Sequence, residues 1–387
     1  MALTLDGTNG IVSSGSITTQ SATGVIFSDS SSLTAAASPY VLKNRLINGA
    51  MVIDQRNAGA SVTPANTYTL DRWQGVVSQL SKFTVQQNAG SVTPPSGYKN
   101  YLGVTSSSSY SVLTGDYFMI SQRIEGYNFA DLMFGTASAQ TFTFSFWVRS
   151  SLTGTFGGSF QGAASATLRS YPFSYTIISA NTWEQKTVTV AGDTFTNTWD
   201  STNGIGLFVN FGLGAGTSAS GTAGAWASAN YANATGATSV VGTNGATWYV
   251  TGVQLEVGST ATPFERRLYN AELANCQRYC PVFDMGSGGL NDISRGFAAT
   301  STLSDFTLSL LVTPRVPPTG ITTSGTFGVG NGAAGGTATN VAIQAGGNST
   351  LSLRATTTAG SPTLSQGVGA GFYGLSNGKI IATGCEL

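Results

Sequence analysis

The stretch TFTFSFWVR, residues 141–149, decides the fold class of this chain. Its phenylalanines recur at every second position, with Thr, Ser and Trp147 between them. Because successive side chains of a strand point to opposite faces of a sheet, this strand has one apolar face and one mostly polar face. Such a strand buries its apolar face against a second layer, which predicts two packed sheets.

Further stretches on both sides repeat this alternation. They are SKFTVQ (81–86), KTVTV (186–190), GLFVNFGL (206–213) and TWYVTGVQLEV (247–257). Clusters of Gly, Asn and Ser separate these strands, and no helical pattern of normal length lies between them. Many short strands with such turns are typical of a sandwich or jelly roll. We therefore predict an all-β jelly-roll domain over residues 44–265.

A single helical pattern follows this region. Tyr269, Leu273, Cys276 and Cys280 form one apolar stripe along NAELANCQRYC, and Pro281 ends the pattern. This predicts a short helical neck over residues 266–283. Two arrangements would cover the stripe: packing around a symmetry axis between subunits, or packing on the chain's own sandwich.

The two ends of the chain differ from this middle part. Residues 1–43 carry few charged and few apolar side chains, so we expect this segment to order only by intertwining with copies of itself or with another protein. Residues 284–387 are rich in Gly, Thr, Ala and Ser. Here FTLSLLV (306–312), TNVAIQ (339–344), STLSLRA (349–355) and NGKIIATGCEL (377–387) indicate strands, and GAAGG (332–336) and GVGAGFYG (367–374) indicate loops. This predicts a small C-terminal β domain.

The composition excludes several classes of function. The chain has 387 residues, 17 basic and 17 acidic side chains, no histidine and three cysteines. Zero net charge removes the counterion release that drives nucleic-acid binding, so we expect no nucleic-acid partner. Without histidine there are no Ser–His or Cys–His nucleophiles. The cysteines form no disulfide framework, and we expect neither a secretory signal nor insertion into a membrane.

Two framing motifs resemble a known family. NRLINGAMVIDQRNAG (44–59) with YTLDRW (68–73) resembles the opening of a carbohydrate-binding-like jelly-roll module found in phage tail-fibre and minor virion proteins. YVTGVQLEVGSTATPFERR (249–267) with YNAELANCQRY (269–279) resembles its last strand and exit helix. LTLDGTNGI (3–11) resembles the N-terminal repeats that join phage fibres to the particle.

The resemblance implies a homotrimeric tail fibre, made in the host cytoplasm and placed in the virion tail. Residues 1–43 would attach it to a tail or baseplate protein, and the fibre would bind host surface polysaccharide without chemistry. The 17 acidic residues are scattered and carry no glycosidase motif, so we expect no enzyme. The alternative is a structural virion component, such as a head fibre, decoration or tail adaptor protein, without a receptor role.

Aromatic and polar residues give the candidate glycan sites. Rings that stack on sugars and neighbouring donors to hydroxyl groups are the chemistry required. On the sheet face these are Trp147, Arg149 and, from a neighbouring strand, Asn210; in a loop they are Trp226 and Tyr231; and in the C-terminal domain they are Phe372 and Tyr373, with Phe297 as a further exposed ring. For each ring, packing inside the fold or against another subunit is the alternative.

A structural calcium ion is a further hypothesis. The family's jelly rolls commonly hold calcium near the junction of the first and last strands, and here Asn48, Asp71 and Glu256 would supply oxygens. Alternatively, Asp71 pairs with Arg72 or Arg45, and Glu256 caps a turn. No other cofactor is expected.

Overall fold

We describe a computed structural model of the chain. It describes residues 25–26, 32–33, 43–163, 168–196, 199–285, 292–331, 335–358 and 364–387. Before residue 43 the described part is an antiparallel pair, β1 (Val25–Ile26) with β2 (Ser32–Leu33). The predicted intertwining of residues 1–43 otherwise lies outside the described residues. Within them, no helix is long and apolar enough to cross a membrane.

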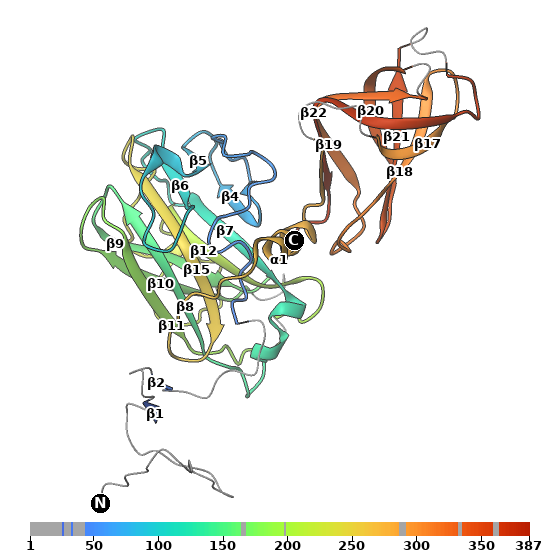
Figure 1. Ribbon diagram of the computed structural model, residues 1–387. Coiled ribbons are helices and arrows are strands. Elements are labelled where there is room, and N and C mark those ends of the chain that lie inside the picture. The colour runs from blue at the N-terminus through green and yellow to red at the C-terminus, as the bar shows by residue number, and fades with distance from the viewer. Residues whose placement is uncertain are drawn as a thin grey trace, which may run out of the picture. The chain divides into compact units, whose positions relative to one another are not determined.

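The middle of the chain forms two antiparallel sheets (Figure 1). The first has the strand order β10-β9-β12-β7-β4-β3 and the second β11-β8-β15-β6-β5. The bounds are β3 (Thr67–Leu70), β4 (Trp73–Val77), β5 (Phe83–Gln87), β6 (Leu102–Ser106), β7 (Tyr117–Glu125), β8 (Phe142–Ser150), β9 (Gly154–Gln161), β10 (Ser170–Ile177), β11 (Glu184–Val190), β12 (Ile205–Ala215) and β15 (Thr247–Val257). Short elements connect them: β13 (Ser220–Gly221) with β14 (Asn233–Ala234), and the 3-10 turns η1 (Ala89–Ser91), η2 (Gly126–Asn128) and η3 (Ala130–Leu132).

The core lies between the two sheets. Phe144 and Phe146 of β8 point inward and meet Phe211 of β12, with ring centroids 5.4 and 5.0 Å apart. The chain crosses repeatedly from one sheet to the other, for example from β7 to β8 and from β11 to β12, which is the connectivity of a jelly roll. The predicted all-β sandwich and the inward face of residues 141–149 are therefore confirmed.

One α-helix, α1 (Tyr269–Gln277), is found among the described residues. Its buried Cys276, together with Tyr279 just beyond its end, packs on Ile47 and Ile53 at the start of the sandwich. Of the two arrangements that the sequence leaves open, the helix therefore packs on its own sandwich. Tyr269 falls outside the covered stripe and is 60% exposed.

The C-terminal residues form a closed barrel. Its strands are β16 (Val282–Asp284), β17 (Asp292–Ala298), β18 (Leu303–Ser309), β19 (Gly320–Gly330), β20 (Gly335–Gly346), β21 (Thr350–Thr357) and β22 (Gly369–Thr383). The order is β16-β22-β17-β18-β21-β20-β19, and β22 also pairs with β19, which closes the sheet. Phe306, Leu353 and Phe372 fill the interior.

Two predictions about this region need correction. GVGAGFYG (367–374) is not a loop, because β22 begins at Gly369. At Gly371 only glycine fits between the packed strands, because a Cβ there would lie 2.3 Å from an oxygen of the Asp292 side chain. Part of the predicted loop 332–336 also belongs to β20, which starts at Gly335.

Candidate functional site

The outer face of the five-stranded sheet carries the strongest of the predicted sites. Because Phe146 and Val148 of β8 point into the core, Trp147 and Arg149 point outward. Trp147 lies opposite Gln185 of β11 on one side and Thr251 of β15 on the other. This register defines a row of side chains across three strands.

Two segments of chain cover the β15 side of this face. Thr251 donates its hydroxyl to the carbonyl of Asn100 at 2.7 Å, in the segment that leads into β6. Gln254 accepts the backbone N–H of Glu265 at 2.7 Å, in the segment that follows β15. Side chains of β15 are therefore already used for internal hydrogen bonds.

The part of this face over Trp147 and the edge strand β11 is accessible, whereas Thr143 and Ser145 of β8 are buried and Thr189 donates its hydroxyl to the carbonyl of Ser259 at 3.3 Å. Gln185, Thr187 and Thr189 alternate along the edge strand β11 and are all exposed. Trp147 is half-buried beside them, and among the described residues its indole makes no hydrogen bond and no ring contact. We call these four residues the Trp147 strip. It combines one free aromatic face with neutral donors and acceptors.

An aromatic cluster that the sequence did not predict borders the Trp147 strip. The ring of Tyr101 lies 5.2 Å from that of Tyr249 and 5.5 Å from that of Trp183. Arg149 lies over Tyr249 at 5.5 Å and donates to the carbonyl of Asn181 at 2.9 Å. The signal for Tyr249 was present, since its neighbour Trp248 points inward and the alternation places Tyr249 outward.

A stack of two rings and a guanidinium also lies on the β15 side of this face. Tyr98 and Phe264 meet edge to face at 5.5 Å, and Arg266 lies over Tyr98 at 4.8 Å. Tyr98 rests on β15 at Gly252, where the φ of +61° and a Cβ only 2.5 Å from the Tyr98 hydroxyl both require glycine.

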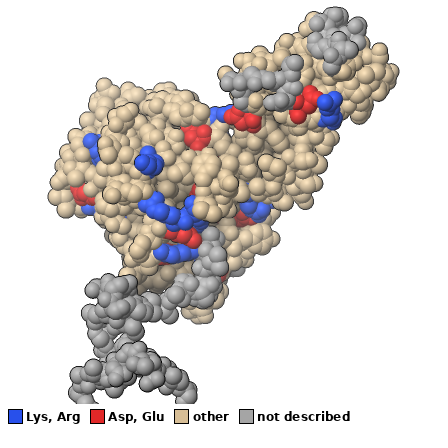
Figure 2. Space-filling model, viewed as in Figure 1, with Lys and Arg blue, Asp and Glu red and all other residues tan. Residues whose placement is uncertain are grey.

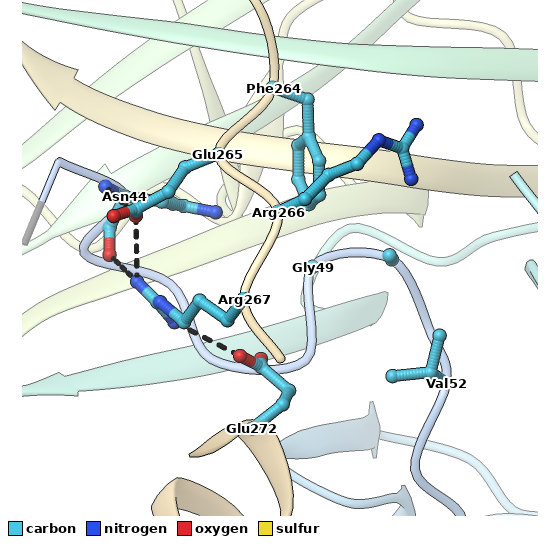
Figure 3. Close-up of a pocket in the computed structure, with 9 residues that line it drawn as sticks. Asn44, Gly49, Val52, Phe264, Glu265, Arg266, Arg267 and Glu272 are labelled. Carbon is cyan, nitrogen blue, oxygen red and sulfur yellow. Dashed lines mark hydrogen bonds and ion pairs between the residues drawn. The ribbon is translucent and has the colours of Figure 1, made fainter. Parts of the chain in front are cut away.

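The same segment lines a cavity of about 90 Å³. Figure 3 shows Phe264 and Arg266 on one side of the segment's backbone and Arg267 on the other. Arg267 points the other way and pairs with Glu265 at 3.2 Å and Glu272 at 3.3 Å. Charges around the neck therefore pair within one chain. Figure 2 shows the visible face as largely uncharged, with acidic and basic side chains lying close together.

Asn210 does not join Trp147, which corrects the sequence interpretation. It belongs to β12, in the other sheet, and is fully buried. Its amide donates to Ser159 at 3.1 Å and to Gln161 at 2.8 Å. The neighbours of β8 are β11 and β15, and alternation within a strand cannot identify them.

Trp226 and Tyr231 do not present free rings in a loop. The Trp226 indole donates to the carbonyl of Ala191 at 2.8 Å and meets the rings of Tyr171 and Trp199, both at 5.3 Å. Tyr231 packs so closely over Gly221 that a Cβ there would lie 2.2 Å from its ring. Both rings therefore serve packing.

The two C-terminal candidates also lie within a strand. Phe372 is fully buried and stacks with Phe306 at 5.0 Å and Phe327 at 5.6 Å. Tyr373 lies half-buried over Gly328, where a Cβ would be 2.1 Å from its ring. Because the Phe372 ring is fully enclosed by the barrel core, it cannot stack on a sugar, and Phe372 is excluded as a glycan contact.

The three residues predicted to hold calcium are engaged separately. Asn48 accepts from the N–H of Ile53 at 3.0 Å and donates to the carbonyl of Asp71 at 3.0 Å. The Asp71 carboxylate accepts two hydrogen bonds from Gln55, and burial raises its pKa. Glu256 accepts from Thr262, six residues along the chain. Among the described residues, no group of three or more acidic or cysteine side chains is placed to hold a metal ion.

The acidic residues of the jelly roll have structural partners. Glu125 accepts from Arg278 at 2.5 Å and 2.9 Å, and Asp193 accepts from Arg169 at 2.7 Å and 2.8 Å. Asp131 pairs with Arg45 at 2.5 Å. These carboxylates therefore hold the fold together.

Comparisons with known proteins add little to this geometry. No family model matches the chain, and no curated protein matches it. One similar solved structure is the enzymatically active domain of tailspike protein 4 of bacteriophage CBA120, with 12% identity and a TM-score of 0.30, over 56% of this chain and 21% of that one. The chain thus spans about a fifth of that protein.

Two further structures are similar over a little more than half of the chain. A putative sugar binding protein from Bacteroides thetaiotaomicron has 10% identity and a TM-score of 0.36, over 56% of this chain and 100% of that one. The family 11 carbohydrate-binding module of a Clostridium thermocellum cellulase has 11% identity and a TM-score of 0.27, over 53% and 99%. TM-scores this low carry no argument about function.

Proposed function

We propose that this chain is a virion adhesin that binds host-surface glycans on the Trp147 strip and performs no chemistry. The observation that carries the proposal is the uncovered indole of Trp147 beside the exposed side chains of β11. The framing motifs at 44–73 and 249–279 support it, through their resemblance to the jelly-roll module of phage tail fibres.

The chemistry of the strip suits a neutral sugar. The apolar face of a pyranose ring stacks on an indole, and its hydroxyl groups exchange hydrogen bonds with amide and hydroxyl side chains. Gln185 and Thr187 supply such groups next to Trp147. Because they carry no charge, binding should change little with salt.

Assembly and location are part of the same proposal. We propose a homotrimer placed in the virion tail, with residues 1–43 attached to a tail or baseplate protein, because the segment 3–11 resembles phage attachment repeats. Three weak sites on one fibre would act together, since the first contact makes the later ones intramolecular. A mass measurement under native conditions tests the trimer, and a stable monomer would contradict it.

The test of adhesion compares Trp147→Ala with Tyr127→Ala, which removes a ring that is 63% exposed elsewhere on the sandwich. Purified wild-type protein should block adsorption of the phage to its host cells. Trp147→Ala should lose most of this inhibition at an unchanged melting temperature, whereas Tyr127→Ala should keep it.

Three results would contradict parts of the proposal. If Trp147→Ala inhibits like the wild type, the strip is not the site. If the wild-type protein binds virions but not cells, the chain is a structural virion component. Release of reducing ends from purified host polysaccharide would show an enzyme.

A further inference from the structure

A second polar face lies on the outside of the C-terminal barrel. Phe297 of β17 lies opposite Asp305 of β18, and Asp305 lies opposite Arg354 of β21. The next residue along β18 and the preceding one along β21, Phe306 and Leu353, are buried in the barrel core. Because side chains alternate along a strand, Phe297, Asp305 and Arg354 all point outward.

A cavity of about 340 Å³ lies over this row. This volume is within the range of small-molecule sites, which is roughly 300–1,000 Å³. Hydroxyl and amide groups from neighbouring strands complete the wall: Thr307, Gln344 and Ser352.

The aromatic ring of the cavity is available for a ligand. Phe297 is 52% exposed, whereas Phe306, Phe327 and Phe372 stack with one another inside the barrel. On β22, Phe297 lies opposite Gly369, whose position is almost open, so no side chain covers the ring from that strand. A single exposed phenylalanine needs no explanation by itself, but this one lines a cavity together with charged and hydroxyl side chains.

The charged pair beside the ring has a fixed geometry. Arg354 donates from Nε to one oxygen of Asp305 at 2.6 Å and from Nη2 to the other at 2.8 Å. These hydrogen bonds, with the charge of Arg354, lower the pKa of Asp305, so the pair stays ionised at neutral pH. The pair retains the second N–H of Nη2 next to the carboxylate, both N–H groups of Nη1 on its far side, and the second lone pair of each carboxylate oxygen.

Both arginines that line the cavity, Arg295 and Arg354, are paired with a carboxylate, one of them outside the lining. Asp305 neutralises Arg354, and Asp292 pairs with Arg295 at 2.5 Å. An anionic ligand would need a cation that is not already compensated. A neutral ligand with adjacent hydroxyl groups needs both a donor and an acceptor, which the planar pair provides.

We propose that this cavity is a second saccharide site, which takes a neutral pyranose unit of a glycan. The sugar ring stacks on Phe297, and two adjacent hydroxyl groups bind the outer edge of the Asp305–Arg354 pair. The site shares no residue with the Trp147 strip, so glycan binding in the barrel does not depend on glycan binding by the jelly roll.

The test uses the full-length protein on a printed array of neutral oligosaccharides, followed by calorimetric titration of the strongest binders. At least one glycan should bind Phe297→Ala about tenfold more weakly, as expected for losing a stacked ring. Phe297→Trp should restore binding to within about threefold. Arg354→Lys should also weaken binding, because an ammonium cannot form the planar pair.

Two controls separate this site from the first. Leu311→Ala, at a side chain that is 88% exposed in the same domain, should bind normally. All six tryptophans lie between residues 73 and 248. Binding in the barrel should therefore leave tryptophan emission unchanged and survive Trp147→Ala.

The proposal is overturned if no glycan on the array meets both conditions, weaker binding by Phe297→Ala and normal binding by Trp147→Ala. It is also overturned if Phe297→Ala lowers the native mass of the assembly and leaves all glycan binding unchanged. That result would make the face a contact between copies of the chain.

Discussion

Glu386 should hold the C-terminal segment on the jelly roll. Its carboxylate pairs with Arg56 at 2.8 Å and with Arg72. The Arg72 side chain is only 1% exposed, whereas that of Arg56 is 17% exposed. Arg72 also lies over the ring of Tyr279 at 3.6 Å. Its charge therefore depends on Glu386 for compensation.

Glu386→Gln should lower the stability of the jelly roll. Removing one partner of a buried ion pair costs about 3–5 kcal/mol, because the other charge stays buried. Glutamine keeps an oxygen acceptor, so we expect the lower end, about 3 kcal/mol. For a domain of roughly 200 residues this lowers the melting temperature by about 6–12 °C. Differential scanning calorimetry of the full chain measures it.

A double variant tests the reason for this loss. In Glu386→Gln with Arg72→Met the deeply buried charge of Arg72 is removed, and only Arg56, whose side chain is 17% exposed, loses its partner, so the double variant should be more stable than Glu386→Gln alone. Asp292→Asn serves as the control, because its partner Arg295 is 80% exposed and such pairs contribute about 0–1 kcal/mol. The reasoning is refuted if Glu386→Gln melts within 2 °C of the wild type, or if the two effects simply add.

Three further predictions concern acid stability, thiol chemistry and strand packing. Burial alone would raise the pKa of Glu125, but its hydrogen bonds and the charge of Arg278 outweigh this and lower the pKa. The stability that its carboxylate contributes is present above the unfolded pKa of about 4.3 and is lost as pH falls through the folded pKa. The melting temperature of Glu125→Gln should therefore fall less steeply than that of the wild type below about pH 4.5. The three thiols, Cys276, Cys280 and Cys385, are buried, and burial raises the pKa of each, for Cys385 to about 11. Ellman's reagent at pH 8 should therefore label none of them in the native protein and all of them in denaturant. Rapid labelling of the native protein would contradict the burial. Gly158→Ala would place a Cβ 2.0 Å from the carbonyl oxygen of Asn210 on β12. It should therefore lower the free energy of unfolding by more than about 4 kcal/mol and give little soluble protein. Normal expression with an unchanged melting temperature would show that the two strands can separate.

The inward face of β8 could be predicted from sequence because alternation is a local property. Phe142, Phe144 and Phe146 point one way in any strand, whatever lies beside it. The error about Asn210 has the opposite cause, since pairing between strands distant in sequence leaves no local signal. The error about Phe372 arose because its glycines indicate a loop, whereas close approach of neighbouring groups also requires glycine.

Sequence by itself determined the fold class, the short helix before Pro281 and the outward direction of Trp147 and Arg149. Each of these follows from the spacing of neighbouring residues. Only the tertiary structure decided which strands flank β8, which rings stay uncovered and which charges are already paired. These properties depend on contacts between residues far apart in the chain: Phe297, Asp305 and Arg354 form one site because three strands align them in one row.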